Sequence, residues 1–153
     1  MPLPLEDPPQ VVNAIVSHVT DATRLVVADH ITSPTAAIFP AQSIVEACRS
    51  RGVEVLIDAA HGPGMVEVNV DALGADYWCG NLHKWVCAPK GAAAVWVAPR
   101  HRDRVRPPVI SHEHLRTFHA AFEWTGTHDP TAVLSAPAAI RFFDAIGWDA
   151  VRA

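Results

Sequence analysis

The sequence contains no long apolar segment. Its apolar runs, such as residues 25–28 and 92–98, are far shorter than the roughly 20 residues that a membrane-spanning helix needs. The first ten residues, MPLPLEDPPQ, are acidic and rich in proline, unlike the basic start and apolar centre of a signal peptide. We therefore expect a protein without a membrane partner, located in the cytoplasm.

Positive charge and paired cysteines are also scarce. Lys and Arg number 12 against 16 Asp and Glu, for a formal net charge of −4, which gives no electrostatic reason to expect nucleic acid as a partner. Cys48, Cys79 and Cys87 are odd in number and lack a C-x-x-C spacing. Reduced thiols are therefore expected, in keeping with the cytoplasm.

Common metal and dinucleotide motifs are missing. His112, His114 and His119 cluster in SHEHLRTFH, but their order is not H-E-x-x-H, and the three cysteines lie elsewhere. Structural zinc sites need four ligands at ordered spacing, so we predict no metal site and interpret this segment as a solvated loop. No G-x-G-x-x-G fingerprint occurs.

What the sequence does contain is an alternation of short apolar runs and helix-like segments. Half of the 153 residues are hydrophobic, a composition typical of one globular domain. Strands are predicted at 25–29, 53–58, 76–81 and 92–98. The continuous apolar character of LVVAD, residues 25–29, is typical of a strand covered on both faces.

Three helices are predicted, at residues 10–19, 41–51 and 130–146. Before the last helix, Asp129 is the predicted N-cap and Pro130 the first helical residue. RHRDRVRPP, residues 100–108, is interpreted as a charged surface connection. The alternation predicts an α/β fold with a mainly parallel sheet flanked by helices.

Polar residues follow three of the predicted strands. They are Thr32 and Ser33, then Asp58 and His61, then Asn81, His83 and Lys84. Ligands of such sheets bind at the carboxyl ends of the strands. The sequence therefore predicts a ligand site at this edge of the sheet.

Lys84 stands in an apolar segment, YWCGNLHKWVCAPKGAAAVWV, although lysine is almost never fully buried unless paired. A desolvated lysine loses part of its preference for the ammonium form, and the neutral amine forms a Schiff base with an aldehyde. Pyridoxal 5′-phosphate (PLP) is the common aldehyde partner, and it needs a lysine, a carboxylate at its ring nitrogen and phosphate donors. Asp58 is of the right type for the carboxylate, and Asn81 and His83 are candidate phosphate donors.

Four segments in order, DHITSPT, VLIDAAHGPG, GADYWCGNLHKWVCAPKGAA and FEWTGTHDPTA, resemble the class V aminotransferase family of fold-type I PLP-dependent enzymes. The closest likeness is to the isopenicillin N epimerase-like branch, which neighbours the cysteine desulfurases. The resemblance implies PLP as cofactor, an amino-acid substrate and part of the large domain of the aspartate-aminotransferase-like fold.

The resemblance also implies a role for each matching residue. Lys84 matches the Schiff-base lysine, and Asp58 matches the aspartate that pairs with the pyridinium nitrogen. His61 matches a position near the phenolic oxygen of the cofactor. Asn81 and His83 match phosphate contacts.

Three threonine and serine residues complete the expected site. Thr32 and Ser33 lie on the loop that faces the cofactor ring and substrate in the family. Thr127 matches a threonine that reaches the phosphate of the neighbouring subunit, which implies a homodimer with shared sites. Structural interpretations also exist: Asp58 is of a type that caps a following loop, and Thr127 fits a turn before a helix. For Asp58 and Lys84 we favour the site, because the structural interpretations require several independent coincidences.

Family members are far longer than 153 residues. We therefore expect residues 1–153 to form the central part of a PLP-transferase large domain, with the N-terminal segment and the C-terminal small domain absent. We also expect exposed apolar surface where those segments would pack, and impaired activity. The predicted function is a PLP-dependent enzyme of the aminotransferase or epimerase type, acting on an amino acid through a Lys84 Schiff base. The alternatives are a non-catalytic remnant or association module, a cysteine desulfurase-like activity and, less favoured, a binding protein for another aldehyde or phosphate.

Overall fold

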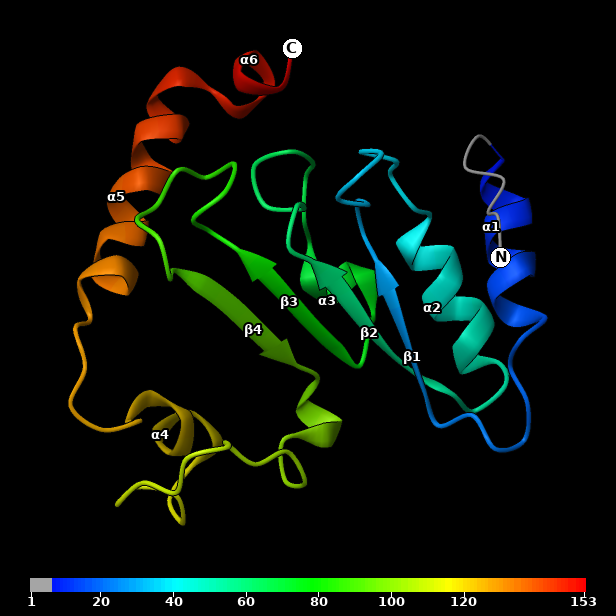
Figure 1. Ribbon diagram of the computed structural model, residues 1–153, viewed down its shortest axis with the longest axis horizontal. Helices are drawn as coiled ribbons and strands as arrows, with labels where there is room; N and C mark the ends of the chain where they lie inside the picture. The colour runs from blue at the N-terminus through cyan, green and yellow to red at the C-terminus, as the bar shows by residue number, and fades with distance from the viewer. Residues whose placement is uncertain (1–6) are drawn as a thin grey trace.

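The computed structural model describes residues 7–153, in which four strands form one sheet in the order β1-β2-β3-β4 (Figure 1). β1 (Leu25–Asp29), β2 (Glu54–Ala59) and β3 (Tyr77–Asn81) run parallel, whereas β4 (Ala93–Val97) runs antiparallel to β3. A loop joins β3 to β4, and antiparallel neighbours need no helical crossover. The predicted α/β class with a mainly parallel sheet is confirmed.

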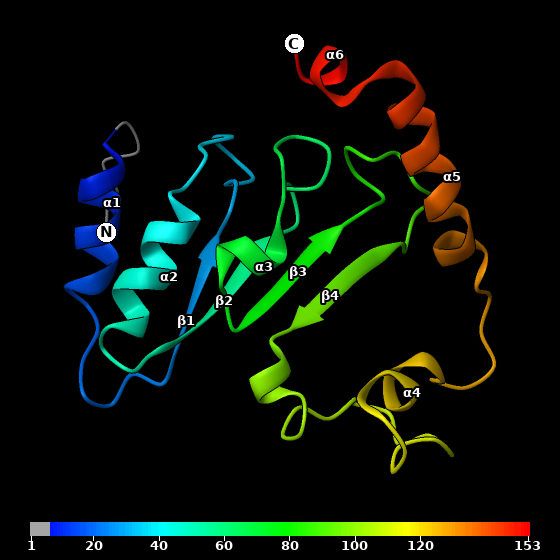
Figure 2. The ribbon, with the colours of Figure 1, turned by 180° about the vertical axis from the view of Figure 1, so that it is seen from behind.

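Two helices cover one face of this sheet. They are α2 (Ala41–Arg49) and the short α3 (Val70–Leu73), and in the view from behind α3 lies in front of the strands (Figure 2). α1 (Pro8–Val16) packs mainly on α2. Val55 and Ile57 of β2 are fully buried against Val11 of α1 and Ile44 of α2. Side chains alternate along a strand, so every second residue of β2 belongs to this core.

The opposite face of the sheet is open. Val27 of β1 is 63% exposed and Val95 of β4 is 71% exposed, and the strand register places both on the face of Leu56 and Cys79. The prediction that residues 25–29 are covered on both faces is therefore wrong, because the helices that pack on β1 and β2 lie on the other face. The exposed apolar surface that we expected is present.

The C-terminal part contains α4 (Phe118–Glu123), α5 (Thr131–Ile146) and α6 (Trp148–Arg152). Small residues of α5 pack on the loop that joins β3 to β4, and they are Ala132, Ala136 and Ala139. The N-cap of α5 is Pro130, so the prediction of Asp129 as N-cap is wrong by one residue. Asp129 Oδ1 still accepts the Thr131 N–H at 2.9 Å, which satisfies an amide of the first turn.

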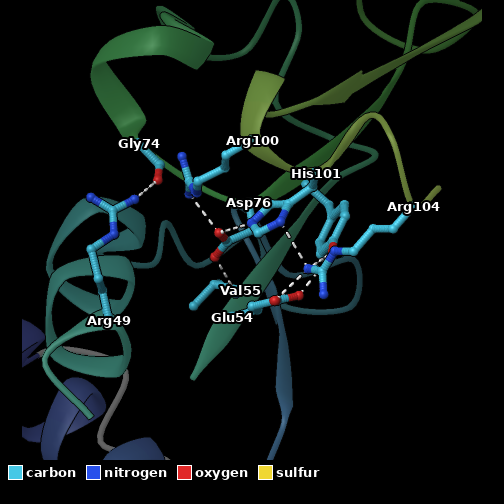
Figure 3. Close-up of polar contacts among 9 residues, drawn as sticks. Arg49, Glu54, Val55, Gly74, Asp76, Arg100, His101 and Arg104 are labelled. Atoms are coloured by element: carbon cyan, nitrogen blue, oxygen red, sulfur yellow. Dashed lines mark hydrogen bonds and ion pairs between the residues drawn. The ribbon is translucent and has the colours of Figure 1, made fainter. Parts of the chain in front are cut away.

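The charged segment after β4 is a surface connection, as predicted, because most of its charged side chains are exposed, but it is also anchored to the fold. It begins with the 3-10 helix η1 (Pro99–His101), which brings Arg100 and His101 onto the carboxylate of Asp76, a side chain only 8% exposed (Figure 3). Asp76 also accepts the Val55 N–H at 2.8 Å. Burial raises the pKa of Asp76, but the hydrogen bonds from His101, Val55 and Arg100 outweigh it and hold that pKa below its ordinary value.

A second set of contacts extends this cluster. Arg104 donates to Glu54 (Figure 3) and to the Tyr77 hydroxyl. The Tyr77 ring stacks on His101 with centroids 5.4 Å apart. We call Asp76, Arg100 and His101, with Glu54, Tyr77 and Arg104, the Asp76 network. It joins η1 to the amino ends of β2 and β3, at the edge opposite the predicted ligand site.

Candidate active site

The carboxyl ends of the parallel strands lie side by side. The register pairs Asp29 of β1 with Asp58 of β2, and Asp58 with Cys79 of β3. Since Ile57 and Ala59 face the helices, the Asp58 side chain belongs to the open face, and Asn81, two residues after Cys79, shares that face. The structure thus brings Asp58 and Asn81 to one edge, as expected from the sequence.

The Asp58 carboxylate is half-buried and has one hydrogen bond. Its Oδ1 atom accepts the N–H of Ala60 at 2.9 Å, so Asp58 does cap the following loop. Among the described residues no donor is bonded to Oδ2. The capping role and a role towards a ligand are therefore compatible.

Lys84 lies against the histidine of the neighbouring loop. Lys84 Nζ is 2.9 Å from His61 Nε2, and both side chains are half-buried. On the other side of the ring, the indole Nε1–H of Trp85 donates to His61 Nδ1 at 3.2 Å. The sequence predicted His61 and Lys84 as site residues but missed Trp85, because no spacing rule indicates a contact between Trp85 and His61.

A glycine permits this approach of the two loops. Gly64 has φ +91°, and a Cβ built there would lie 2.8 Å from the backbone C and O of Trp85. Positive φ and contact with another backbone are both conditions that favour glycine. The segment HGPG, residues 61–64, therefore packs directly on the chain beside Lys84.

His83 is fixed by a backbone carbonyl. Its Nδ1 atom lies 2.9 Å from the oxygen of Ala92, and because a carbonyl only accepts, Nδ1 carries the hydrogen. In the neutral ring Nε2 is then an acceptor. His83 can donate from Nε2 to a phosphate only as the imidazolium, whereas the amide of Asn81 is a donor in any state.

The remaining predicted residues are not brought to Lys84. Thr32 closes its own turn, because its hydroxyl oxygen accepts the Ala37 N–H at 2.9 Å. Ser33 is exposed on the same turn, and Thr127 is exposed between α4 and α5. Among the described residues none of the three is hydrogen-bonded to Asp58 or Lys84.

The three cysteines are free thiols in different surroundings: Cys48 is buried, Cys79 is half-buried and Cys87 is exposed. Burial raises the pKa of the Cys48 thiol, with a smaller opposing effect of Arg51. Burial also raises the pKa of Cys79, and the charge of Asp58 raises it further. Cys79, the thiol nearest to Asp58, is thus disfavoured as a thiolate nucleophile.

The sequence of the chain matches a known protein family. The family model of Aminotransferase class-V matches residues 5–153, so the chain belongs to that family. An L-cysteine desulfhydrase of Arabidopsis thaliana is 40% identical over 121 residues, which cover 78% of this chain and 27% of the relative. An isopenicillin N epimerase of Amycolatopsis lactamdurans is 32% identical over 164 residues, which cover 97% of this chain and 41% of the relative.

A solved structure shares the fold. A variant of C-DES with glycine covalently linked to its PLP cofactor superposes with a TM-score of 0.79 at 20% identity, over 89% of this chain and 39% of that chain. The present chain thus spans well under half the length of the relatives it matches. No helix among residues 7–153 has the length and apolar character needed to cross a membrane.

Proposed function

We propose that this chain carries the reactive lysine and the ring-nitrogen carboxylate of a PLP-dependent enzyme that acts on an amino acid, of the aminotransferase or epimerase type. The observation that carries the proposal is the 2.9 Å contact of Lys84 Nζ with His61. This contact lies in the loops that follow the strand ends bearing Asp58 and Asn81. Membership of the class V family supports the same function.

The residues present fit PLP. When bound, PLP supplies an aldehyde that condenses with an amine and a protonated ring that accepts electrons. Lys84 provides the amine, and Asp58 has an oxygen without a donor on the open face of the sheet, suited to a protonated ring nitrogen. Asn81 provides an amide donor for a phosphate, while His61 offers its ring near the amine.

Each side chain then has one task. The negative charge of Asp58 holds a proton at the ring nitrogen, since an opposite charge favours the protonated form. The free amine of Lys84 would remove and return a proton at the substrate Cα. Asn81 would anchor the phosphate, with His83 as a second contact when its ring is the imidazolium. Thr32 and Ser33 remain proposed contacts of the cofactor ring and substrate, as the family resemblance implies.

Sulfur removal from cysteine is a second candidate function, favoured by the 40% identity to an L-cysteine desulfhydrase. A desulfurase that transfers sulfur to its own thiolate needs a reactive cysteine, and the raised pKa of Cys79 disfavours that residue. Elimination of sulfide directly from the substrate needs no such cysteine. Among the sulfur reactions, the identity to an L-cysteine desulfhydrase supports the elimination type.

The proposal extends to the surroundings of the site. We propose that residues 1–153 form the central part of a large domain. The open face of the sheet and the small share of the relatives' length that the chain covers support this proposal. A homodimer in which Thr127 reaches the neighbouring site is compatible with its exposure between α4 and α5. Three free thiols support a cytoplasmic location.

The test is a titration of the purified chain with PLP, followed by visible absorbance, borohydride reduction and mapping of the modified residue. We expect the label on Lys84, its loss in Lys84→Ala and weaker binding in Asp58→Ala. Lys90→Ala, which removes an exposed lysine six residues away, is the matched control and should still be labelled. A folded chain with no label, or with label scattered over Lys90 and the N-terminal amine as well as Lys84, would favour the non-catalytic remnant.

A further inference from the structure

We infer that Trp85 is a positioning residue that fixes the tautomer of His61, so that this ring presents a hydrogen to the Lys84 amine. The catalytic significance of this role rests on the proposed function, whereas the hydrogen bonds that define it do not. The role depends on two contacts that link three side chains in the order Trp85, His61, Lys84. The two distances are 3.2 Å from Trp85 Nε1 to His61 Nδ1 and 2.9 Å from His61 Nε2 to Lys84 Nζ.

The first step concerns the donor at Trp85. An indole Nε1–H donates and never accepts, so the His61 Nδ1 atom that it contacts must offer a lone pair. A neutral imidazole carries one ring hydrogen, and the bond made by one nitrogen decides which nitrogen carries it. The hydrogen of His61 is therefore on Nε2.

The second step concerns Lys84. The Nε2–H of His61 points to the lysine nitrogen at 2.9 Å, and an ammonium group has three donors but no acceptor. An ammonium would place two N–H groups against each other across this distance. The lysine nitrogen can accept this hydrogen as a neutral amine, which is the form that reacts with an aldehyde.

The third step concerns how Trp85 is held. Gly64 lies against its backbone, and the Cys87 N–H donates to the Lys84 carbonyl at 3.0 Å, which closes the turn around Trp85. The indole is 46% exposed and its ring centroid lies 6.1 Å from that of His61. The side chain thus belongs to the site more than to the core, and Trp85→Phe keeps its apolar ring while it removes the donor.

A neighbouring histidine provides the internal reference. His83 donates from Nδ1 to the Ala92 carbonyl, so its tautomer is the opposite of that inferred for His61. Its partner is backbone and does not involve Trp85. One spectrum should therefore show two histidines of this region in different tautomers.

The experiment is long-range proton–nitrogen NMR of the chain with ¹⁵N-labelled histidine rings, at about pH 8, above the usual histidine range. His61→Gln assigns the signals. We expect His61 as Nε2–H in the wild type and an increased Nδ1–H population in Trp85→Phe, with His83 unchanged. Trp124→Phe, which alters another exposed indole, is the control. A wild-type His61 in the Nδ1–H form, or an unchanged His61 in Trp85→Phe, overturns the inference.

A second readout follows Lys84 itself. The rate of its modification by an amine-specific acetylating reagent, with Lys90 as internal reference, should fall about fivefold in Trp85→Phe, the factor expected for one net hydrogen bond. A changed tautomer with an unchanged rate would overturn the link to the amine. Neither measurement uses PLP, so failure of the proposed function and failure of this inference are distinguishable.

Discussion

Asp58 and Cys79 lie directly opposite each other on β2 and β3, with both side chains on the open face of the sheet. Neighbouring strands are about 4.8 Å apart, close enough for the carboxylate to disfavour a thiolate. Burial has the largest effect on the raised pKa of Cys79, and Asp58 has the next largest. Cys79 therefore reports on the charge of the proposed ring-nitrogen partner.

Replacement of Asp58 by Asn should make Cys79 more reactive. Loss of the negative charge lowers the pKa of the thiol, so the thiolate fraction and the alkylation rate should rise several-fold at constant pH. Mass spectrometry of Cys79 after timed exposure to iodoacetamide measures this rate. Asp29→Asn, one strand further away on the same face, should have a smaller effect. Equal rates in both variants would contradict the prediction.

The Asp76 network should make the fold sensitive to acid. The pKa of Asp76 is lower in the folded chain than its ordinary value, so its contribution to stability is present above the unfolded value of about 3.9. That contribution is lost as the pH falls through the folded pKa. Urea unfolding between pH 7 and pH 3 should show this decrease in the free energy of unfolding.

Asp76→Asn should remove this dependence together with part of the stability. Asn keeps one acceptor oxygen but loses the negative charge that Arg100 and His101 face, and Arg100 is 49% exposed to solvent, so the expected cost is about 1–2 kcal/mol. Asp103→Asn changes an exposed carboxylate on the following turn and should leave both quantities nearly unchanged. An Asp76→Asn chain that loses stability with acid as steeply as the wild type would assign the effect to other groups.

The strands were predictable because their apolar runs are continuous, but their environment was not. LVVAD has the composition of a strand covered on both faces, and only the packing of α2 shows that Ala28 is buried while Val27 is exposed. Sequence alone does not distinguish an apolar residue with a partner from one without. The short helices α3, α4 and α6 were missed because a few residues show no helical period.

The placement of the candidate site could be predicted where it depends on local motifs, but not where it depends on tertiary contacts. Motifs predicted Asp58, His61 and Lys84 at the carboxyl edge of the sheet, whereas the Trp85–His61 bond depends on how two loops meet. RHRDRVRPP was correctly predicted as a surface connection, but its anchoring was missed, because a charged run looks the same whether or not some of its side chains bind a buried acceptor. The buried acceptor is Asp76, which lies 24 residues before Arg100, so no local pattern indicates the contact.

Gly64→Ala should destabilise the chain and disturb the site. The substitution forces an alanine to φ +91° and places its Cβ 2.8 Å from the Trp85 backbone. A positive φ costs about 1–2 kcal/mol, and the overlap adds about 1–3 kcal/mol. Gly52→Ala, at φ +70° with nothing within 4 Å, bears only the first cost. Urea unfolding of both variants therefore isolates the overlap, and equal losses would mean that the two loops are not in tight contact.

The open face of the sheet should drive association of the isolated chain. Val27 and Val95 are exposed on edge strands of this face, and exposed apolar patches and edge strands both promote self-association. The double variant Val27→Thr with Val95→Thr should therefore sediment with less self-associated material, while its free energy of unfolding changes by less than about 0.5 kcal/mol, as for surface substitutions. Val55→Thr is the matched change on the covered face, where a buried hydroxyl without a partner costs about 1–3 kcal/mol. Self-association that persists in the double variant would place the contact elsewhere, and a large loss of stability would mean that the open face is covered within the folded chain.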